Sequence, residues 1–429
     1  MRYKPLPSEF FIKNRETLTR QLEPGSALIV HGNGLVTSSR DAHYPFRQDS
    51  DFYYLTGIDQ PDCALMLFPD HPTIENREIF FTKRNDEKTL IWEGAYLNDD
   101  QIHSLSGVKR VEDIKEINQI VSDLLKKAGK IYLNFNKNNN LPSVPYSSEY
   151  YTLYYKNRYP LRSFFSIQPL LQKQRRIKDP AEIETLKKAI EITRAGFNNA
   201  VKLIRPAVNE YRIESAFMGE FTARGSRGFA FDPIIASGSD ACILHYIQND
   251  KPCKKGDLLL MDIGAEYAHY NADITRVFPV DKKFTSRQKE IYQAVLNVMS
   301  NSLREISTSQ TLKDFNNLAA TMMEEELLRL NLISSKEVAR QTKENPAYKK
   351  YFMHSASHYL GLDVHDVGDV TQKLEPGVVI TLEPGIYIRE EGLGIRLEND
   401  ILLTKERYIN LSSDIPIEIE EVEDWVNQP

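Results

Sequence analysis

The sequence predicts an α/β domain followed by an α+β domain that contains an internal repeat. Three observations carry this prediction. Short apolar stretches alternate with helical periodicity up to about residue 170, and a basic segment with a helix-start signal follows. Beyond that segment, the order helix, helix, strands occurs twice within residues 180–405. The chain has 429 residues, enough for two or three domains, and we place the division between residues 1–172 and residues 173–429.

The composition is that of an ordinary soluble protein, with 41% hydrophobic and 27% charged residues. The net charge of −6 gives no electrostatic reason to expect nucleic acid or an anionic membrane surface as a partner. The N-terminus lacks the apolar core of a signal peptide, and no apolar run is long enough to span a membrane. The three cysteines have neither metal-site nor disulfide spacing, so we expect a cytoplasmic protein.

The first part of the chain is predicted to form a sheet with helices on both faces. Four nearly apolar stretches predict strands, at residues 27–30, 63–68, 78–81 and 130–135. Residues 112–127 have apolar residues at helical spacing and predict a helix. Nearly apolar strands are typical of sheets that carry helices on both faces. Residues 39–58 are dense in charges and aromatic rings, and we predict a packed loop there.

Capping signals mark the helices of the second part. Three potential N-cap residues have a polar partner three positions later: Asp179 with Glu182, Thr285 with Gln288, and Thr311 with Asp314. The predicted helices cover about residues 180–204, 209–224, 285–306 and 311–330. Strands are expected within about residues 229–280 and again within about residues 351–403.

The repeat extends to residues that can carry chemistry. Each half contains, in the same order and at similar spacing, a histidine, a glycine, a carboxylate at the end of an apolar run and a second carboxylate. These are His245, Gly256, Asp262 and Asp273 in the first half, and His365, Gly377, Glu383 and Glu398 in the second half. We therefore predict that the two halves each donate two carboxylates to one shared site.

Strand alternation supports a shared site. In the last predicted strand, residues 394–400, Arg396, Glu398 and Asp400 share one face. Thr275 lies on the same face as Asp273, so its hydroxyl could hydrogen-bond a metal-ligand carboxylate. A solvated acidic hairpin is the alternative reading of residues 258–276. It is disfavoured because the first carboxylate of each half ends an apolar run and is soon followed by glycine.

Buried carboxylates in such numbers require cations, because an unpaired buried charge is costly. Two divalent cations with a bridging hydroxide would balance the four carboxylates. His354 and His358 are four residues apart but lack the glutamate of the zinc-peptidase helix, which leaves their roles as ligands or structural residues open. The oxygen-rich donor set without thiolates favours Mn(II), with iron, cobalt or magnesium next, over structural zinc. Metal pairs of this kind commonly support hydrolysis.

Four segments resemble the pita-bread metallopeptidases, a family that includes methionine aminopeptidase, prolidase, Xaa-Pro aminopeptidase and creatinase. These segments are residues 228–276, 354–368, 378–388 and 394–402. The set HYLGLDVHDVG, TLEPGIYI and GIRLEND is highly specific. The N-terminal segment SRDAHYPFRQDSDFYYLTGI, residues 39–58, resembles the bacterial Xaa-Pro aminopeptidases (aminopeptidase P) in particular. The resemblance implies a creatinase-like N-terminal domain and a pita-bread catalytic domain with a pseudo-two-fold repeat.

The resemblance also implies roles for individual residues. The five metal ligands of the family fall on Asp262, Asp273, His358, Glu383 and Glu398, and Glu383 would also accept the proton of the attacking water. The family's substrate-contacting histidines fall on His245 and His365, which would assist the leaving proline nitrogen. His354 and Arg396 match positions beside the ligands or the substrate. Ser355-Ala356 replaces a glycine that often follows the first histidine, a departure that could change the wall of the pocket.

The implied activity is release of the N-terminal residue from peptides with proline in the second position. Prolidase, which cleaves Xaa-Pro dipeptides, is the closest alternative. A binding protein without metals and a creatinase-like hydrolase are disfavoured by the intact ligand set. The family's N-terminal domain serves assembly, so we expect a homodimer or homotetramer. Trp92 could reach a neighbouring subunit, although we favour a packed core position for it.

Overall fold

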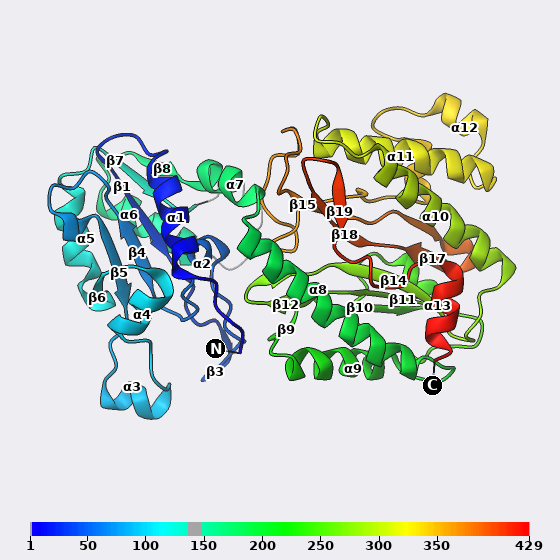
Figure 1. Ribbon diagram of the computed structural model, residues 1–429, viewed down its shortest axis with the longest axis horizontal. Coiled ribbons are helices and arrows are strands. Elements are labelled where there is room, and N and C mark those ends of the chain that lie inside the picture. Colours follow the sequence, from blue (N-terminus) through cyan, green and yellow to red (C-terminus); the bar gives the residue numbers. More distant parts are fainter. Residues whose placement is uncertain (1, 136–146, 429) are drawn as a thin grey trace. The chain divides into compact units, whose positions relative to one another are not determined.

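The computed structural model describes residues 2–135 and 147–428 (Figure 1). The chain forms two compact units, one spanning Lys4–Gln174 and the other beginning at Arg175 and including Arg2 and Tyr3. Within the described ranges, no helix combines the length and the apolar composition needed to cross a membrane.

A six-stranded mixed sheet forms the first unit, in the order β6–β5–β4–β1–β7–β8. Its strands are β1 (Ser26–His31), β4 (Ala64–Leu67), β5 (Glu78–Thr82), β6 (Arg110–Asp113), β7 (Lys130–Leu133) and β8 (Phe164–Ser166). The helices of this unit are α1 (Ser8–Thr19), α2 (Ser50–Thr56), α3 (Glu87–Trp92), α4 (Asp99–Ser106), α5 (Ile117–Leu125) and α6 (Ser147–Arg158). The predicted α/β character of this part of the chain is confirmed.

Both faces of this sheet are buried, as its nearly apolar strands predict. Alternate strand residues such as Ile29 join Val121 of α5 in one hydrophobic core. On another part of the sheet, the ring of Phe80 lies 5.9 Å from that of Phe52 in α2. Strands buried on both faces cannot show polar alternation, which explains their continuous apolar sequence.

Two predictions for this unit are wrong in part. The helix expected from residue 112 begins only at Ile117, because residues 110–113 form the edge strand β6 and the Asp113 carboxylate caps the following turn. The packed loop expected over residues 39–58 is instead an exposed hairpin, β2 (Thr37–Ser39) with β3 (Ala42–His43), followed by the buried helix α2.

The short helix α3 projects from the rest of the first unit (Figure 1). Leu90, Ile91 and Trp92 are 50%, 71% and 79% exposed, respectively. The core position favoured for Trp92 is therefore wrong. Only Thr89 of this helix is buried, so the segment has no face that could enter a core.

The second unit contains the predicted repeat of two helices followed by strands. The first half comprises α8 (Pro180–Ala200), α9 (Glu210–Ala223), β9 (Gly228–Phe229), β10 (Ile234–Ser237), β11 (Leu258–Ile263), β12 (Ala265–Tyr267), β13 (Tyr270–Asn271) and β14 (Ile274–Pro279). The second half comprises α10 (Ser286–Glu305), α11 (Leu312–Arg329), α12 (Ser335–Arg340), β15 (Val379–Leu382), β16 (Gly385–Ile388), β17 (Leu393–Arg396), β18 (Asn399–Leu403), β19 (Tyr408–Asn410) and α13 (Ile419–Val426). Helix α7 covers Gln168–Arg176.

The capping residues begin the long helices where the sequence predicts. The side chains of Asp179, Thr285 and Thr311 each accept a backbone N–H of the first turn, and their polar partners bond back to them. The repeated glycines also match, because Gly256 and Gly377 both adopt positive φ, 87° and 94°, just before the strands β11 and β15.

Antiparallel pairing brings the predicted site residues to the ends of strands. β11 lies between β10 and β14, with Asp262 opposite Thr275. β15 pairs with β18, so Glu383 immediately follows one strand and Glu398 immediately precedes the other. Aromatic rings of Phe197, Phe278 and Trp425 pack between the helices and this sheet.

Two strand predictions are wrong in this unit. Residues 351–378 contain no assigned strand and make only isolated bridges, such as Tyr359 with Ile380. The predicted strand over residues 394–400 is broken into β17 and β18. At the break, the backbone N–H groups of Leu397 and Glu398 donate to the carbonyls of Pro384 and Thr275, outside either ladder.

Candidate metal centre

A cavity of about 510 Å³ lies in the second unit and is lined by both halves of the repeat. It collects all nine side chains singled out from the sequence: His245, Asp262, Asp273, His354, His358, His365, Glu383, Arg396 and Glu398. The apolar part of its wall comes from residues such as Phe231, Ile234, Leu244, Ile247 and Val364.

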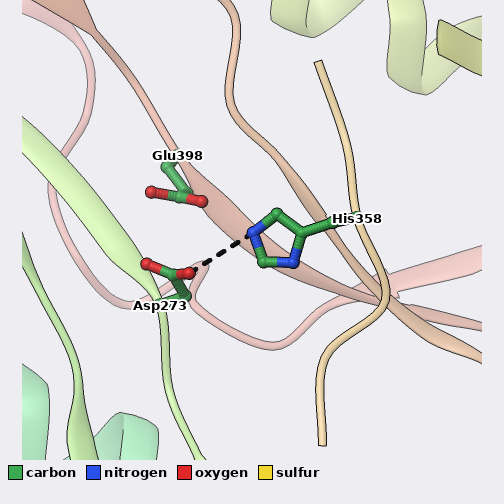
Figure 2. Close-up of side chains that lie close together, drawn as sticks. All are labelled: Asp273, His358 and Glu398. Atoms are coloured by element: carbon green, nitrogen blue, oxygen red, sulfur yellow. Dashed lines mark ion pairs between the residues drawn. The ribbon is translucent and has the colours of Figure 1, made fainter. Parts of the chain in front are cut away.

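Asp273, His358 and Glu398 form the tightest group in the cavity (Figure 2). One donor atom from each lies within 4.8 Å of the others. The Nε2 atom of His358 is 3.4 Å from Oδ2 of Asp273 and 3.7 Å from Oε1 of Glu383. Figure 2 shows the two carboxylates close together, with the imidazole facing them from a separate segment. Such a group of nitrogen and oxygen donors could hold a divalent cation.

The backbone fixes the orientation of the His358 ring. Its Nδ1 lies 2.9 Å from the carbonyl oxygen of Tyr359. A carbonyl can only accept, so Nδ1 carries a proton, and Nε2 is the ring nitrogen that faces the carboxylates. This arrangement is typical of metal-bound histidine.

His354 is held in a different way, although it is only four residues before His358 in the sequence. Its Nδ1 lies 2.8 Å from the Ser355 carbonyl, and its Nε2 lies 2.7 Å from the hydroxyl of Tyr387. Both ring nitrogens are therefore occupied by protein groups. Burial, reinforced by the charge of Arg396, lowers the pKa of His354 to about 4, which keeps the ring neutral. Its Nδ1 also lies 3.5 Å from Oε2 of Glu383, but the ring is not grouped with Asp273 and Glu398.

Asp262 is paired with Arg396 across the cavity. Nη2 of Arg396 donates to Oδ2 of Asp262 at 2.5 Å, and Nη1 donates to the Tyr387 hydroxyl at 2.9 Å. The other carboxylate oxygen of Asp262, Oδ1, is buried and has no hydrogen-bond partner among the described residues. An unsatisfied buried carboxylate oxygen at a cavity wall is a suitable ligand atom for a cation.

The remaining carboxylates repel one another. Burial, followed by the charges of Asp262, Asp400 and Glu383, raises the pKa of Asp273 well above its ordinary value. Burial and the neighbouring carboxylates, led by Asp273, raise the pKa of Glu398 in the same way. Burial is also the main reason that the pKa of Glu383 rises to about 7 and that of Asp400 to about 8.

These shifts mean that the protein alone does not neutralise the acidic groups of the cavity. A bound cation would favour their ionised forms. Together with the free Oδ1 atom of Asp262 and the Nε2 atom of His358, they fit the divalent metal expected from the sequence.

Hydrogen bonds from the first half hold the carboxylates of Glu398 and Asp400 in the second half. The hydroxyl of Thr275 donates to Oε2 of Glu398 at 2.6 Å, as its strand phase suggests. The backbone N–H of Glu398 donates to the Thr275 carbonyl at 3.1 Å; within the second half, that of Glu383 donates to the Ala356 carbonyl at 2.8 Å. The backbone N–H of Asp273 donates to Oδ2 of Asp400 at 3.2 Å.

The two remaining histidines lie on loops at the cavity. The ring of His365 is 4.4 Å from that of His358 and nearly perpendicular to it. Burial, then the neighbouring His358 and His245, lowers the pKa of His365. His245 is exposed at the wall of the cavity. Both could therefore meet a ligand without being metal donors.

Sequence reasoning missed Tyr387, whose hydroxyl joins His354 to Arg396. It lies in the apolar strand β16, where a tyrosine is ordinarily a core residue. One signal was present in the sequence: Tyr387 is two residues after Gly385 and shares its strand face. The pairing of Gly385 with Arg396 is visible only in the structure. A side chain on Gly385 would meet the Tyr387 hydroxyl at 2.6 Å, so this glycine leaves room for the phenol.

Comparison with known proteins agrees with this geometry. The model of the metallopeptidase family M24 matches residues 184–405, and that of the aminopeptidase P N-terminal domain matches residues 11–132. The Xaa-Pro aminopeptidase of Escherichia coli (strain K12) is 36% identical, with 96% of each chain covered. That of Haemophilus influenzae is 34% identical, with 98% of each chain covered.

Solved structures give the same relationship. Zinc-substituted E. coli aminopeptidase P in complex with product superposes with a TM-score of 0.87 at 33% identity, covering 99% of both chains. The E. coli enzyme with the inhibitor Pro-Leu gives the same values. The matched segments include every carboxylate and histidine that lines the cavity. This chain belongs to the metallopeptidase family M24.

Proposed function

We propose that this protein is a metal-dependent aminopeptidase that releases the N-terminal residue from peptides with proline in the second position. The observation that carries the proposal is the grouping of Asp273, His358 and Glu398 in one cavity. Relatives named Xaa-Pro aminopeptidase that align over nearly the full chain support the choice of substrate over the dipeptides of a prolidase.

We propose that five residues hold two divalent cations: Asp262, Asp273, His358, Glu383 and Glu398. When bound, two such cations supply Lewis-acid chemistry that lowers the pKa of water and polarises a carbonyl group. The number of buried carboxylates supports two cations, because one would leave several negative charges unpaired. The oxygen-rich donor set supports Mn(II). Metal analysis after purification and reloading would test the choice.

The remaining roles belong to the side chains of this protein. Glu383 accepts the proton of the attacking water, while His354 and Arg396 hold their neighbours Tyr387 and Asp262 in place. His245 and His365 face the substrate. A tertiary amide nitrogen must be protonated before it leaves, and an imidazole within hydrogen-bond reach of it can deliver that proton.

Peptide length and the second residue test the substrate. We expect cleavage of a tripeptide with proline second, and strong loss of cleavage when alanine replaces the proline or when metal is removed. Cleavage of Xaa-Pro dipeptides without cleavage of the tripeptide would show a prolidase. Activity that is unchanged in a metal-free preparation would contradict the metal-dependent reaction altogether.

We also propose that residues 1–172 form a domain for assembly into a homodimer or homotetramer, with residues 173–429 as the catalytic domain. The exposed side chains of Leu90, Ile91 and Trp92 on α3 support a protein contact at that helix. Light scattering of the parent protein and of Trp92→Ser tests it, and a monomeric parent would overturn it. The three buried free thiols support a reducing cytoplasmic setting.

A further inference from the structure

The loop that carries His245 forms several hydrogen bonds to one buried carboxylate, which does not itself line the cavity. This loop, residues 238–251, begins after Ser237 at the end of β10 and is here termed the His245 loop. Glu210, the first residue of α9, is 0% exposed, although its side chain is a carboxylate. It does not line the cavity. Such a group is stable in the interior only when hydrogen bonds satisfy it.

Four hydrogen bonds satisfy the Glu210 carboxylate, and all of them come from the His245 loop or its borders. Oε1 accepts the backbone N–H and the hydroxyl of Ser237, at 2.8 and 2.6 Å. Oε2 accepts the Tyr246 hydroxyl at 2.8 Å and the backbone N–H of Lys251 at 3.0 Å. The backbone N–H of Glu210 adds a bond to the Lys251 carbonyl at 3.0 Å. One side chain therefore ties the two ends of the loop to its middle.

The contact in the middle of the loop is made by Tyr246, the residue after His245. Tyr246 is buried, whereas His245 and Ile247 on either side of it are exposed and line the cavity. Among the described residues, the imidazole of His245 makes no hydrogen bond of its own. Its place at the cavity therefore depends on the backbone that presents it. Asn249 supports the same backbone, because its Oδ1 accepts the Ile235 N–H at 3.0 Å.

We propose that Glu210, acting through Tyr246, is a positioning residue that holds His245 at the substrate. The inference rests on the substrate-facing role proposed for His245. A histidine displaced by about 1 Å can lose up to about 100-fold in rate, because proton transfer depends on close approach. No ligand of the proposed cations belongs to this network, so its effect should be separable from metal binding.

Two substitutions loosen the network without removing bulk. Tyr246→Phe deletes one hydroxyl and keeps the ring, and Glu210→Gln keeps the shape while losing one acceptor. Tyr292→Phe is the matched control: its buried hydroxyl donates to the Ile417 carbonyl at 2.8 Å, in the same unit but outside the loop. Each is made in the parent and in a His245→Ala background, and kcat and KM are measured with a proline-second tripeptide.

We expect Glu210→Gln to lower kcat/KM by about 10- to 100-fold and Tyr246→Phe by about 3- to 10-fold, mainly in kcat. Tyr292→Phe should leave both constants unchanged. In the His245→Ala background, the first two substitutions should cause no further loss. A purely structural network would lower activity by the same factor with and without His245. Bound metal, measured in every variant, should stay at the parent level.

The possible failures are distinguishable. If His245→Ala alone keeps the activity of the parent, the substrate-facing role of His245 is wrong, and the positioning role falls with it. If His245→Ala is impaired but Tyr246→Phe reduces its activity further by the same factor as in the parent, the positioning inference is wrong and the role of His245 stands. If Glu210→Gln does not fold, Tyr246→Phe decides between these outcomes, since it preserves the buried ring.

Discussion

Buried charge is balanced in different ways on two sides of the cavity. The arginine side consists of Asp262, His354, Tyr387 and Arg396, and the carboxylate side consists of Asp273, His358, Glu398 and Asp400. On the arginine side, a guanidinium pairs directly with the one carboxylate. Burial opposes the charge of Arg396, but Tyr387, Asp262 and Glu398 outweigh it, so its pKa lies well above the ordinary value.

Among the described residues, no arginine or lysine forms an ion pair with a carboxylate on the carboxylate side; Asp273 faces the imidazole of His358 at 3.4 Å. Its three acidic groups have raised pKa values, with burial as the leading cause and neighbouring carboxylates next for Asp273 and Glu398. The two sides are only a strand apart, since Asp262 lies opposite Thr275. The contrast shows that the number of buried carboxylates alone does not indicate where a metal binds. The carboxylates that the protein leaves unpaired indicate where an external cation is needed.

The largest expected effect comes from neutralising single carboxylates, Asp273 or Glu398 on the carboxylate side and Asp262 on the arginine side. Asp273→Asn and Glu398→Gln should lower kcat/KM by at least about 100-fold and reduce bound metal, because even residues that only hydrogen-bond a ligand contribute about 10- to 100-fold. In the metal-free protein, Asp273→Asn should raise the melting temperature by relieving repulsion. Asp262→Asn should lower it, because Arg396 then remains buried without its charged partner, a change that costs about 3–5 kcal/mol.

Activity assays, metal analysis and thermal unfolding in chelator measure these three quantities on the same samples. Opposite shifts in melting temperature for the two aspartate variants would establish the contrast between the sides. Equal destabilisation by both variants would contradict it, and so would full metal content in Asp273→Asn.

A smaller effect is expected from pH on the metal-free protein. The pKa of Glu383 is about 7 and that of Asp400 about 8, against ordinary values of 4.5 and 3.8. The folded state therefore binds protons that the unfolded state has released, and the associated stability is lost as pH rises through 7 to 8. Between pH 6.5 and 8 the melting temperature in chelator should fall by about 4 °C or more.

The buried histidines affect stability mainly below this pH range. Burial lowers the pKa of His31 to about 3, so its contribution to stability is lost below about pH 6.5, in the opposite direction. Asp400→Asn should reduce the dependence on pH, and saturating Mn(II) should abolish or reverse it, because the cation requires ionised ligands. A melting temperature in chelator that stays constant from pH 6.5 to 8 would contradict the unpaired carboxylates.

The residues that gather in the cavity could be predicted because many of their signals are local. Asp262 and Glu383 end apolar runs, and the same order of histidine, glycine and carboxylates occurs in both halves. Strand ends that carry acids are unusual enough to be recognised without a structure. The capping boxes at Asp179 and Thr285 were predictable for the same reason, since each depends on two side chains three residues apart.

The pairing of these groups could not be predicted in the same way. Arg396 and Asp262 are 134 residues apart, and nothing near either residue indicates the other. The break between β17 and β18 depends on hydrogen bonds to Pro384 and Thr275, which belong to other segments. The exposure of Trp92 likewise depends on what the rest of the unit leaves uncovered.

The smallest effect is expected at Thr275, which joins the two sides of the cavity. Its hydroxyl donates to Oε2 of Glu398 at 2.6 Å and accepts from Nε of Arg396 at 3.2 Å. Thr275→Val keeps the shape but removes both bonds, and it should lower kcat/KM by about 10-fold and stability by about 1–3 kcal/mol. Thr275→Ser keeps the hydroxyl and should retain most of the parent activity. If Thr275→Val keeps the parent kcat/KM while Thr275→Ser lowers it, the methyl group matters and the hydroxyl does not. The two sides would then be held in register by packing alone, without this bridge between Glu398 and Arg396.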